Sequence, residues 1–306
     1  LQLLAEARQR FPDAEGRRAS HHRIALKLHR FLQVSYRLNS AMWTVAPIVA
    51  GAMASPPAQR GFMMPLWLPL DTQASPAYEL LLGVQVPCCW LCSETSVLLD
   101  CAMLALMLQA AAELAVLNDR LCGVGANRGD TAGGKGALQP QADVLHRLVE
   151  NINHHQIIIT YMHLLEMMLS RGISVLLICN TISICFHIVA TVALLQEDIE
   201  PVGMTKMVLG STLYAYQTAI LCLLGQRITT QSERLPVSAF SCDWPSADNR
   251  FRRLLMVFCL RSSQALVIRV CGLYSLSRET LLQVLKAAYT LFNFVYQTVG
   301  EEEPLN

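Results

Sequence analysis

Charged residues are scarce in this chain, and that scarcity limits what the chain can be. Asp, Glu, Lys and Arg together make up 15% of its 306 residues, whereas 53% are hydrophobic. Soluble domains usually carry about 25% charged residues, so the composition favours a membrane protein. The net charge of +1 gives no support to nucleic-acid binding, which draws on an excess of basic residues.

The arrangements that catalysis needs are also missing. No serine elbow and no pair of catalytic carboxylates is visible in the sequence, so we do not expect an enzyme. The glycines and the lysine of segment 129–135 have the spacing of a phosphate-binding loop. Gly136, however, stands where that loop needs a Ser or Thr hydroxyl, and no strand precedes it. We therefore expect no bound nucleotide and no other cofactor.

A metal site is not expected either. The chain has 11 cysteines, and most of them lie in apolar runs, where cysteine behaves as a small hydrophobic side chain. They are therefore predicted to pack rather than to form disulfide bridges or bind metal. Four possible metal ligands occur at helical spacing, and we again favour no metal there: His154, His155, His163 and Glu166.

Long apolar runs dominate instead, and an apolar helix needs about 20 residues to cross a bilayer. Residues 172–196 include no Asp, Glu, Lys or Arg, and residues 207–226 are equally free of charge. We predict an all-α fold, a polytopic transmembrane helical bundle that forms a single domain over residues 1–306. The predicted spans are 31–53, 80–117, 172–196, 207–226 and 275–299, and residues 250–270 are predicted to form a cytoplasmic amphipathic helix.

The distribution of basic residues indicates how these spans are oriented. If the spans alternate in direction, one side receives segments 1–37, 117–171 and 226–278, which carry 8, 5 and 8 Lys and Arg residues. The loops on the other side carry only Arg60 and Lys206. Cytoplasmic loops accumulate Lys and Arg, so we predict an inverted topology, with residue 1 inside the cell and the C-terminus outside. A G-protein-coupled receptor has the opposite sidedness.

The last predicted span carries many side chains that can form hydrogen bonds. An unsatisfied polar group is costly in hydrocarbon, so we predict that this helix lines a water-filled path. Helical spacing places four of its residues on one face, and hydrophobic rings can gate such a path by dewetting. The alternative is that this face packs against neighbouring helices. The predicted pore residues are Tyr289, Phe292, Asn293, Tyr296 and Gln297.

Two other helix faces combine aromatic and polar side chains. A pocket for a small organic ligand needs an apolar, aromatic lining with one or two polar groups, although core packing explains the same pattern. Asp100 is an acid inside a predicted span, which suggests function by default, but we expect it to hydrogen-bond to a neighbouring helix. The candidate ligand-binding residues are Tyr36, Asn39, Met42 and Trp43 on one face and Tyr214, Gln217 and Thr218 on the other.

Several short motifs occur in an order and at spacings that resemble insect odorant receptors. One span ends with Gln217, Cys222 and Gly225, and the last helix opens with a Ser-Leu-x-x-x-Thr run over residues 275–280. Further matching elements are Ser232, Phe240 with Trp244, Lys286 with Tyr289 and Thr290, the Leu-Asn-Asp-Arg-Leu run at 117–121, and the Leu-Pro-Leu-Asp turn at 68–71.

The resemblance implies a seven-span receptor, of which this chain supplies about five spans and lacks the N-terminal two. It implies the ligand-binding subunit of an odorant-gated, non-selective cation channel, in a heteromeric tetramer with the odorant receptor co-receptor. It also implies a multi-pass protein in the plasma membrane of olfactory sensory neuron dendrites, with a small volatile organic ligand. The alternatives are a membrane protein that resembles G-protein-coupled receptors and a non-functional fragment of an odorant receptor.

Overall fold

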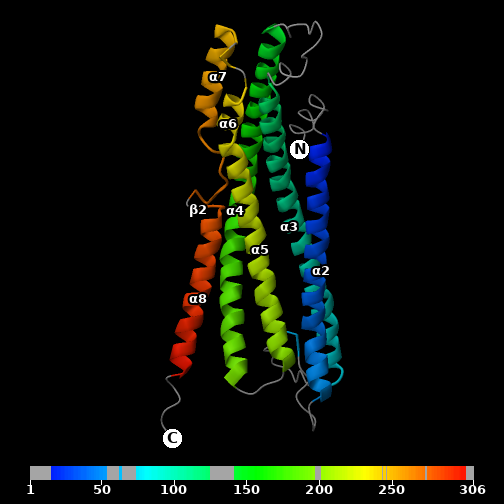
Figure 1. The fold of residues 1–306 in the computed structure, drawn as a ribbon. Helices are drawn as coiled ribbons and strands as arrows, with labels where there is room; N and C mark the ends of the chain where they lie inside the picture. The colour runs from blue at the N-terminus through cyan, green and yellow to red at the C-terminus, as the bar shows by residue number, and fades with distance from the viewer. Residues whose placement is uncertain are drawn as a thin grey trace, which may run out of the picture. The chain divides into compact units, whose positions relative to one another are not determined.

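The computed structural model describes residues 15–53, 62–63, 74–124, 141–196, 201–242, 244–245, 247–272 and 274–300. These residues form the helices α2 (Glu15–Met53), α3 (Ala77–Gly123), α4 (Gln141–Gln196), α5 (Pro201–Glu233), α6 (Leu235–Phe240), α7 (Asn249–Ser262) and α8 (Arg278–Gly300), and the strands β1 (Arg269–Val270) and β2 (Tyr274–Ser275) (Figure 1). Segments 68–71 and 129–136, singled out from the sequence, lie outside the described residues.

Within the described part of the chain, three helical stretches are long and apolar enough to cross a membrane, judged by length and composition. They are Ala77–Gly123, Asp143–Leu194 and Val202–Phe240. At a rise of about 1.5 Å per residue, each exceeds the ~30 Å of a bilayer's hydrocarbon core. These stretches contain the predicted spans 80–117 and 207–226 and residues 172–194 of the predicted span 172–196. The predicted span 31–53 falls in α2, and residues 278–299 of the predicted span 275–299 fall in α8. The prediction of an all-α fold is confirmed.

The predicted amphipathic helix 250–270 is longer than the helix in the structure. Helix α7 ends at Ser262, and the antiparallel pair of β1 and β2 follows it. Polar residues at 262–264 interrupt the apolar pattern, and the β-branched residues that come next favour extended backbone. Positive φ angles at Cys271 (51°) and Gly272 (70°) then reverse the chain between the strands. The last helix accordingly begins at Arg278 and not at residue 275.

The chain divides into two compact units, each made of three separate segments. Unit 1 comprises Leu1–Ala25, Met103–Ser174 and Leu221–Thr280, and unit 2 comprises Leu26–Ala102, Val175–Ile220 and Leu281–Asn306. The helices α2, α3, α4, α5 and α8 therefore each contribute residues to both units. That the chain forms one domain over residues 1–306 stays a prediction.

The core of unit 1 is built around the C-terminal part of α3. Residues 110–118 of this helix are all buried, and the Leu114 side chain has no exposed surface. Ile158 of α4 and Ile228 of α5 are also fully buried. Helix α7 turns an apolar face toward α4, where the ring centroids of Phe258 and His155 lie 5.2 Å apart. Unit 1 therefore joins helices that are distant in the sequence through one apolar core.

Two residues of the short motifs singled out from the sequence, Asn118 and Ser232, make specific contacts in unit 1. The Asn118 amide nitrogen donates a hydrogen bond to the backbone carbonyl of Gln231 at 2.8 Å, and its oxygen accepts one from the Ser238 hydroxyl at 2.7 Å. The Ser232 hydroxyl accepts a hydrogen bond from the backbone N–H of Leu266 at 2.9 Å. These contacts fix the turn after α5 and the chain that follows α7.

Gly225 permits the close approach of α5 to the segment before α8. A Cβ atom on Gly225 would lie 2.3 Å from the Cβ of Leu276 and 2.5 Å from its carbonyl oxygen. We expect Gly225→Ala to lower the free energy of unfolding by about 1–3 kcal/mol, because backbone atoms cannot move aside as a flexible side chain can. Thermal unfolding of the purified protein in detergent measures this change.

Gly172→Ala is the matched control for this prediction, since a Cβ atom at Gly172 would meet nothing within 4 Å. Alanine is the better helix former by about 1 kcal/mol, so this variant should keep or slightly raise the melting temperature. Equal melting temperatures for the two alanine variants would contradict the predicted clash at Gly225.

In unit 2, polar contacts join α2 to α3 at intervals of about one helical turn. They are Arg37 with Glu94 (2.8 Å), Ser40 with Ser93 (2.8 Å), and Trp90 with Thr44 (3.2 Å). Leu32 of α2 and Val97 of α3 are also buried, at 1% and 2% exposure. Arg37, Ser40 and Thr44 therefore have partners on α3, and this pairing accounts for their presence in an otherwise apolar segment.

Candidate functional site

Two of the predicted ligand-binding residues of unit 2 meet at Asp100. This residue lies on α3 and is 4% exposed. Its Oδ2 atom accepts a hydrogen bond from the Tyr36 hydroxyl of α2 at 2.7 Å and another from the Gln217 amide of α5 at 2.6 Å. The expectation that Asp100 forms hydrogen bonds with neighbouring helices is confirmed. A carboxylate inside a membrane protein is costly unless it is paired, and here two helices supply the donors.

A fourth helix completes this polar network. Asn180 of α4 is 3% exposed, and its amide nitrogen donates hydrogen bonds to Gln217 Oε1 and Thr218 Oγ1, both at 3.2 Å. Gln217 therefore donates to Asp100 and accepts from Asn180, which determines how its amide is oriented. Such linked hydrogen bonds strengthen one another in surroundings of low polarity. Sequence reasoning did not single out Asn180, although an amide inside the charge-free run 172–196 was a usable clue.

The aromatic candidates of unit 2 gather around His187 of α4. The His187 ring centroid lies 5.5 Å from that of Tyr214 and 6.4 Å from that of Trp43. Its Nδ1 atom lies 2.7 Å from the backbone carbonyl of Ser183, so Nδ1 carries a proton and donates it to that carbonyl. A Cβ atom on Gly210 of α5 would fall 2.6 Å from Nε2 of the same ring. The glycine thus makes room for a histidine that the sequence analysis missed.

A lysine also belongs to this aromatic group. The Lys206 Nζ atom of α5 lies 3.5 Å from the centroid of the Trp43 ring, which is close enough for a cation–π interaction. Sequence analysis used Lys206 only to count charges on the outer side. Trp43 therefore lies beside a cation of α5 and a histidine ring of α4.

The two remaining ligand candidates lie on α2 between Tyr36 and Trp43. Asn39 and Met42 are both half-buried, and the Asn39 Oδ1 atom is buried without a hydrogen-bond partner among the described residues. Buried polar atoms in proteins are nearly always satisfied, so this oxygen can accept a donor from a bound molecule. Apart from Met42, for which only half-burial is shown, each candidate is placed in a polar or aromatic contact or offers an open acceptor.

The predicted pore residues lie on α8, where Ala288 is the one buried side chain among those described. Tyr289 and Tyr296 are 66% and 65% exposed, respectively. The Phe292 and Tyr296 rings stack with a centroid separation of 6.0 Å and an interplanar angle of 24°. Asn293 is half-buried and Gln297 is exposed. Their role in a pore stays a prediction, and their exposure leaves this face open to another molecule.

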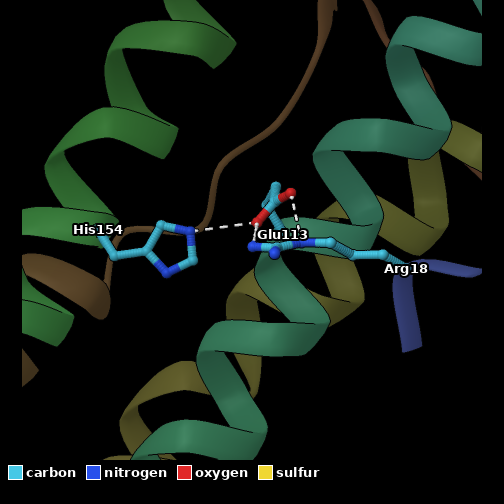
Figure 2. Close-up of polar contacts among 3 residues, drawn as sticks. All are labelled: Arg18, Glu113 and His154. Atoms are coloured by element: carbon cyan, nitrogen blue, oxygen red, sulfur yellow. Dashed lines mark hydrogen bonds and ion pairs between the residues drawn. The ribbon is translucent and has the colours of Figure 1, made fainter. Parts of the chain in front are cut away.

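A second buried polar cluster lies in unit 1 and was not predicted (Figure 2). Glu113 of α3 sits between Arg18 of α2 and His154 of α4. The Arg18 guanidinium donates to both carboxylate oxygens, at 3.1 and 2.9 Å, and the His154 Nε2 atom lies 3.3 Å from Oε2. Glu113 and His154 have no exposed side-chain surface. The two-pronged contact between Arg18 and Glu113 is the strong form of an ion pair.

Three of the four residues considered as metal ligands have other contacts, and the fourth, His163, is exposed. His154 faces Glu113, His155 packs on Phe258, and Glu166 accepts a hydrogen bond from the backbone N–H of Arg269 at 3.1 Å. Among the described residues, no group of three His, Cys, Asp or Glu side chains is placed to hold a metal ion. The 11 cysteines are free thiols, and burial raises the pKa of the Cys259 thiol on α7.

The sequence model of one family, described as 7tm Odorant receptor, matches residues 2–289. This chain belongs to that odorant receptor family. The resemblance inferred from the short motifs is confirmed. So is the prediction that the chain is not an enzyme, because its relatives are odorant receptors. As a member of this family with long apolar helices, the chain is a membrane protein.

Individual odorant receptors are similar over different shares of the chain. Odorant receptor 46a, isoform A, of Drosophila melanogaster is 28% identical over 199 residues, which are 65% of this chain and 49% of the relative. Odorant receptor 42a of the same fly is 22% identical over 303 residues, covering 96% of this chain and 68% of the relative. Odorant receptor 85c is 26% identical over 47% of this chain and 36% of its own length. The chain thus spans about a third to two thirds of these relatives.

A solved structure shows the same fold. The insect olfactory receptor OR5 from Machilis hrabei, in complex with eugenol, superposes with a TM-score of 0.75 at 18% identity, over 93% of this chain and 70% of that one. A second structure of OR5 gives a TM-score of 0.73 over the same shares. The chain therefore has the all-α transmembrane bundle fold of an insect odorant receptor.

Proposed function

We propose that the chain is the ligand-binding part of an odorant receptor that takes a small volatile organic molecule in unit 2. The observation that carries the proposal is the convergence of predicted ligand residues on one group of helices. Tyr36 and Gln217 meet at Asp100, and Trp43 and Tyr214 flank His187. Apolar and aromatic walls with a few placed polar groups are what small-molecule sites require.

Each part of this site has a distinct task in the proposal. The aromatic group around His187 provides flat apolar surface for the odorant. The open Asn39 Oδ1 acceptor binds a hydroxyl or N–H group of the odorant, since satisfying a buried acceptor favours the bound state. The hydrogen-bond network around Asp100 links α2, α3, α4 and α5 and so holds these helices together near the ligand site. OR5 of Machilis hrabei, with the same fold, is known in complex with eugenol, which supports binding of a small organic molecule.

The same proposal assigns α8 to an ion-conducting pore. Tyr289, Phe292 and Tyr296 leave aromatic surface exposed, and exposed hydrogen-bonding groups on a membrane helix favour contact with water or with another subunit. The chain would then act with the odorant receptor co-receptor in a heteromeric tetramer in the plasma membrane of olfactory sensory neurons. An odorant opens the channel only through a higher affinity for the open state than for the closed state.

Electrical recording tests this function. We expect cells that express this receptor together with the co-receptor to show an odorant-evoked, non-selective cation current, and cells with the co-receptor alone to lack the response to the same odorant. Antibody labelling of a C-terminal tag on intact cells reports surface delivery and sidedness in the same preparation. A receptor that reaches the surface with its tag outside, yet gives no current to a broad panel of odorants, would contradict the channel proposal. A tag detected only after permeabilisation would contradict the inverted topology.

A further inference from the structure

Unit 1 contains a cavity of its own, separate from the residues proposed to bind odorants. Its volume is about 320 Å³, and it lies between residues 18–25 of α2 and residues 105–112 of α3. The walls are mostly small or apolar, with Ala105, Leu108 and Ala112 along α3. Known small-molecule sites have volumes of about 300–1,000 Å³, so this cavity suits a molecule at the small end of that range.

Of the three basic residues that line this cavity, Arg18 and His21 are held by other contacts and His22 is exposed. Arg18 lines the cavity, but its guanidinium is held by both carboxylate oxygens of Glu113 (Figure 2). His21 lines it as well, and its Nε2 atom lies 3.2 Å from Nη2 of Arg227. Arginine can only donate, so Nε2 of His21 accepts this hydrogen bond. The lining therefore favours a neutral molecule over an anion such as phosphate.

One residue of the cavity wall, Gln109, has a polar atom without a hydrogen-bond partner among the described residues. This atom is Oε1 of the side-chain amide, and it is buried. A buried acceptor without a donor is unfavourable, and pairing it is favourable. Gln109 can therefore accept a hydrogen bond from a bound molecule, while the alanine and leucine side chains in the same wall favour contact with an apolar group.

We propose that this cavity binds a small neutral alcohol, whose hydroxyl donates to Gln109 Oε1 while its alkyl chain lies against Ala105, Leu108 and Ala112. The site is additional to the odorant site of unit 2 and does not depend on it. Because Arg18 both lines the cavity and holds Glu113, a bound alcohol stabilises the contact of α2 with α3 in unit 1.

Photolabelling of the full chain in lipid nanodiscs tests the proposal. The probe is an octanol that carries a diazirine on its alkyl chain, and the competitors are 1-octanol and its methyl ether, which cannot donate a hydrogen bond. We expect label on peptides containing residues 18–25 or 105–112, and we expect 1-octanol to compete about five-fold better than the ether, as one hydrogen bond predicts. Absence of label in both segments, or equal competition by alcohol and ether, would overturn the proposal.

Three variants sharpen this test. Gln109→Leu should remove the preference for the alcohol over the ether, and Ala105→Phe should remove the label by filling the cavity. Gln156→Leu makes the same chemical change at an exposed position of α4 in unit 1, and it should keep both label and preference. A preference that persists in Gln109→Leu, or full labelling of Ala105→Phe, would count against the site. If a variant does not fold, the competition on the unchanged chain still decides.

A fourth variant separates this proposal from the proposed odorant function. Trp43→Ala alters the aromatic group of unit 2, so we expect the label on residues 18–25 and 105–112 to stay within two-fold of that on the unchanged chain. A loss of this label in Trp43→Ala would show that the alcohol binds at the odorant site and would overturn the separate cavity site. Failure of the current measurement leaves the labelling result unaffected.

Discussion

Replacing Glu113 by Gln should lower the free energy of unfolding by about 3–5 kcal/mol, the cost of removing one partner from a buried ion pair. The side chain keeps nearly the same shape, so little of this loss comes from packing. Its cause is electrostatic, because Arg18 and His154 both contact a carboxylate that is fully buried. The melting temperature and the denaturation midpoint of the purified protein in detergent measure the change.

Glu150→Gln is the matched control for this prediction. Glu150 of α4 is also a carboxylate paired with an arginine, at 3.3 Å from Arg120 of α3, but the pair lies outside the predicted spans and the two side chains are 38% and 26% exposed, respectively. Exposed ion pairs contribute about 0–1 kcal/mol, so this substitution should change stability little. If both glutamine variants lose the same stability, burial is not what gives the Arg18–Glu113 pair its importance.

A double variant tests where the penalty arises. In Glu113→Gln, the Arg18 guanidinium loses the carboxylate that balances its charge. Arg18→Met removes that charge, so Arg18→Met combined with Glu113→Gln should be more stable than the sum of the two single changes predicts. Interaction energies of about 0.5–3 kcal/mol are typical of residues in one network. Strict additivity would show that the two side chains do not stabilise unit 1 as a pair.

The fold could be predicted from the sequence because its main determinants are local. A helix long and apolar enough to span a bilayer is visible in the 172–196 run itself, where no charge occurs. The end of α7 was missed for a similar local reason. The prediction extends the helix through the apolar residues 265–268, but the polar residues at 262–264 interrupt the pattern, and the β-branched Val267 and Ile268 favour the extended conformation that leads into β1.

Only part of the candidate site could be predicted from the sequence, because its contacts depend on which helix faces meet. Helical spacing was enough to group Tyr36 with Trp43 and Tyr214 with Gln217. It could not show that Asn180 and His187 of α4 complete the polar and aromatic groups, since the rotation of α4 about its axis is set by packing against other helices. For the same reason, Glu113 was visible as an acid in an apolar helix, but its pairing with Arg18 and His154 was not.

Replacing Trp43 by Ala should raise the odorant concentration for half-maximal current by about 10- to 100-fold. Burying a large apolar side chain contributes about 1.5–3 kcal/mol, and each 1.4 kcal/mol is a tenfold change in affinity. Trp43 also positions two neighbours, since its ring lies beside His187 and 3.5 Å from Lys206 Nζ. Concentration–response curves from cells that also express the co-receptor measure this shift.

Phe186→Ala separates loss of the site from general damage to unit 2. Phe186 precedes His187 on α4, but its side chain is 70% exposed, so its removal should leave the half-maximal concentration within about two-fold. Surface labelling of both variants corrects for differences in delivery to the membrane. Because Trp43 contacts α4 and α5 together, its loss should affect ligand binding more than the maximal current per receptor at the surface. Similar potency for Trp43→Ala and Phe186→Ala would place the odorant site away from the aromatic group around His187.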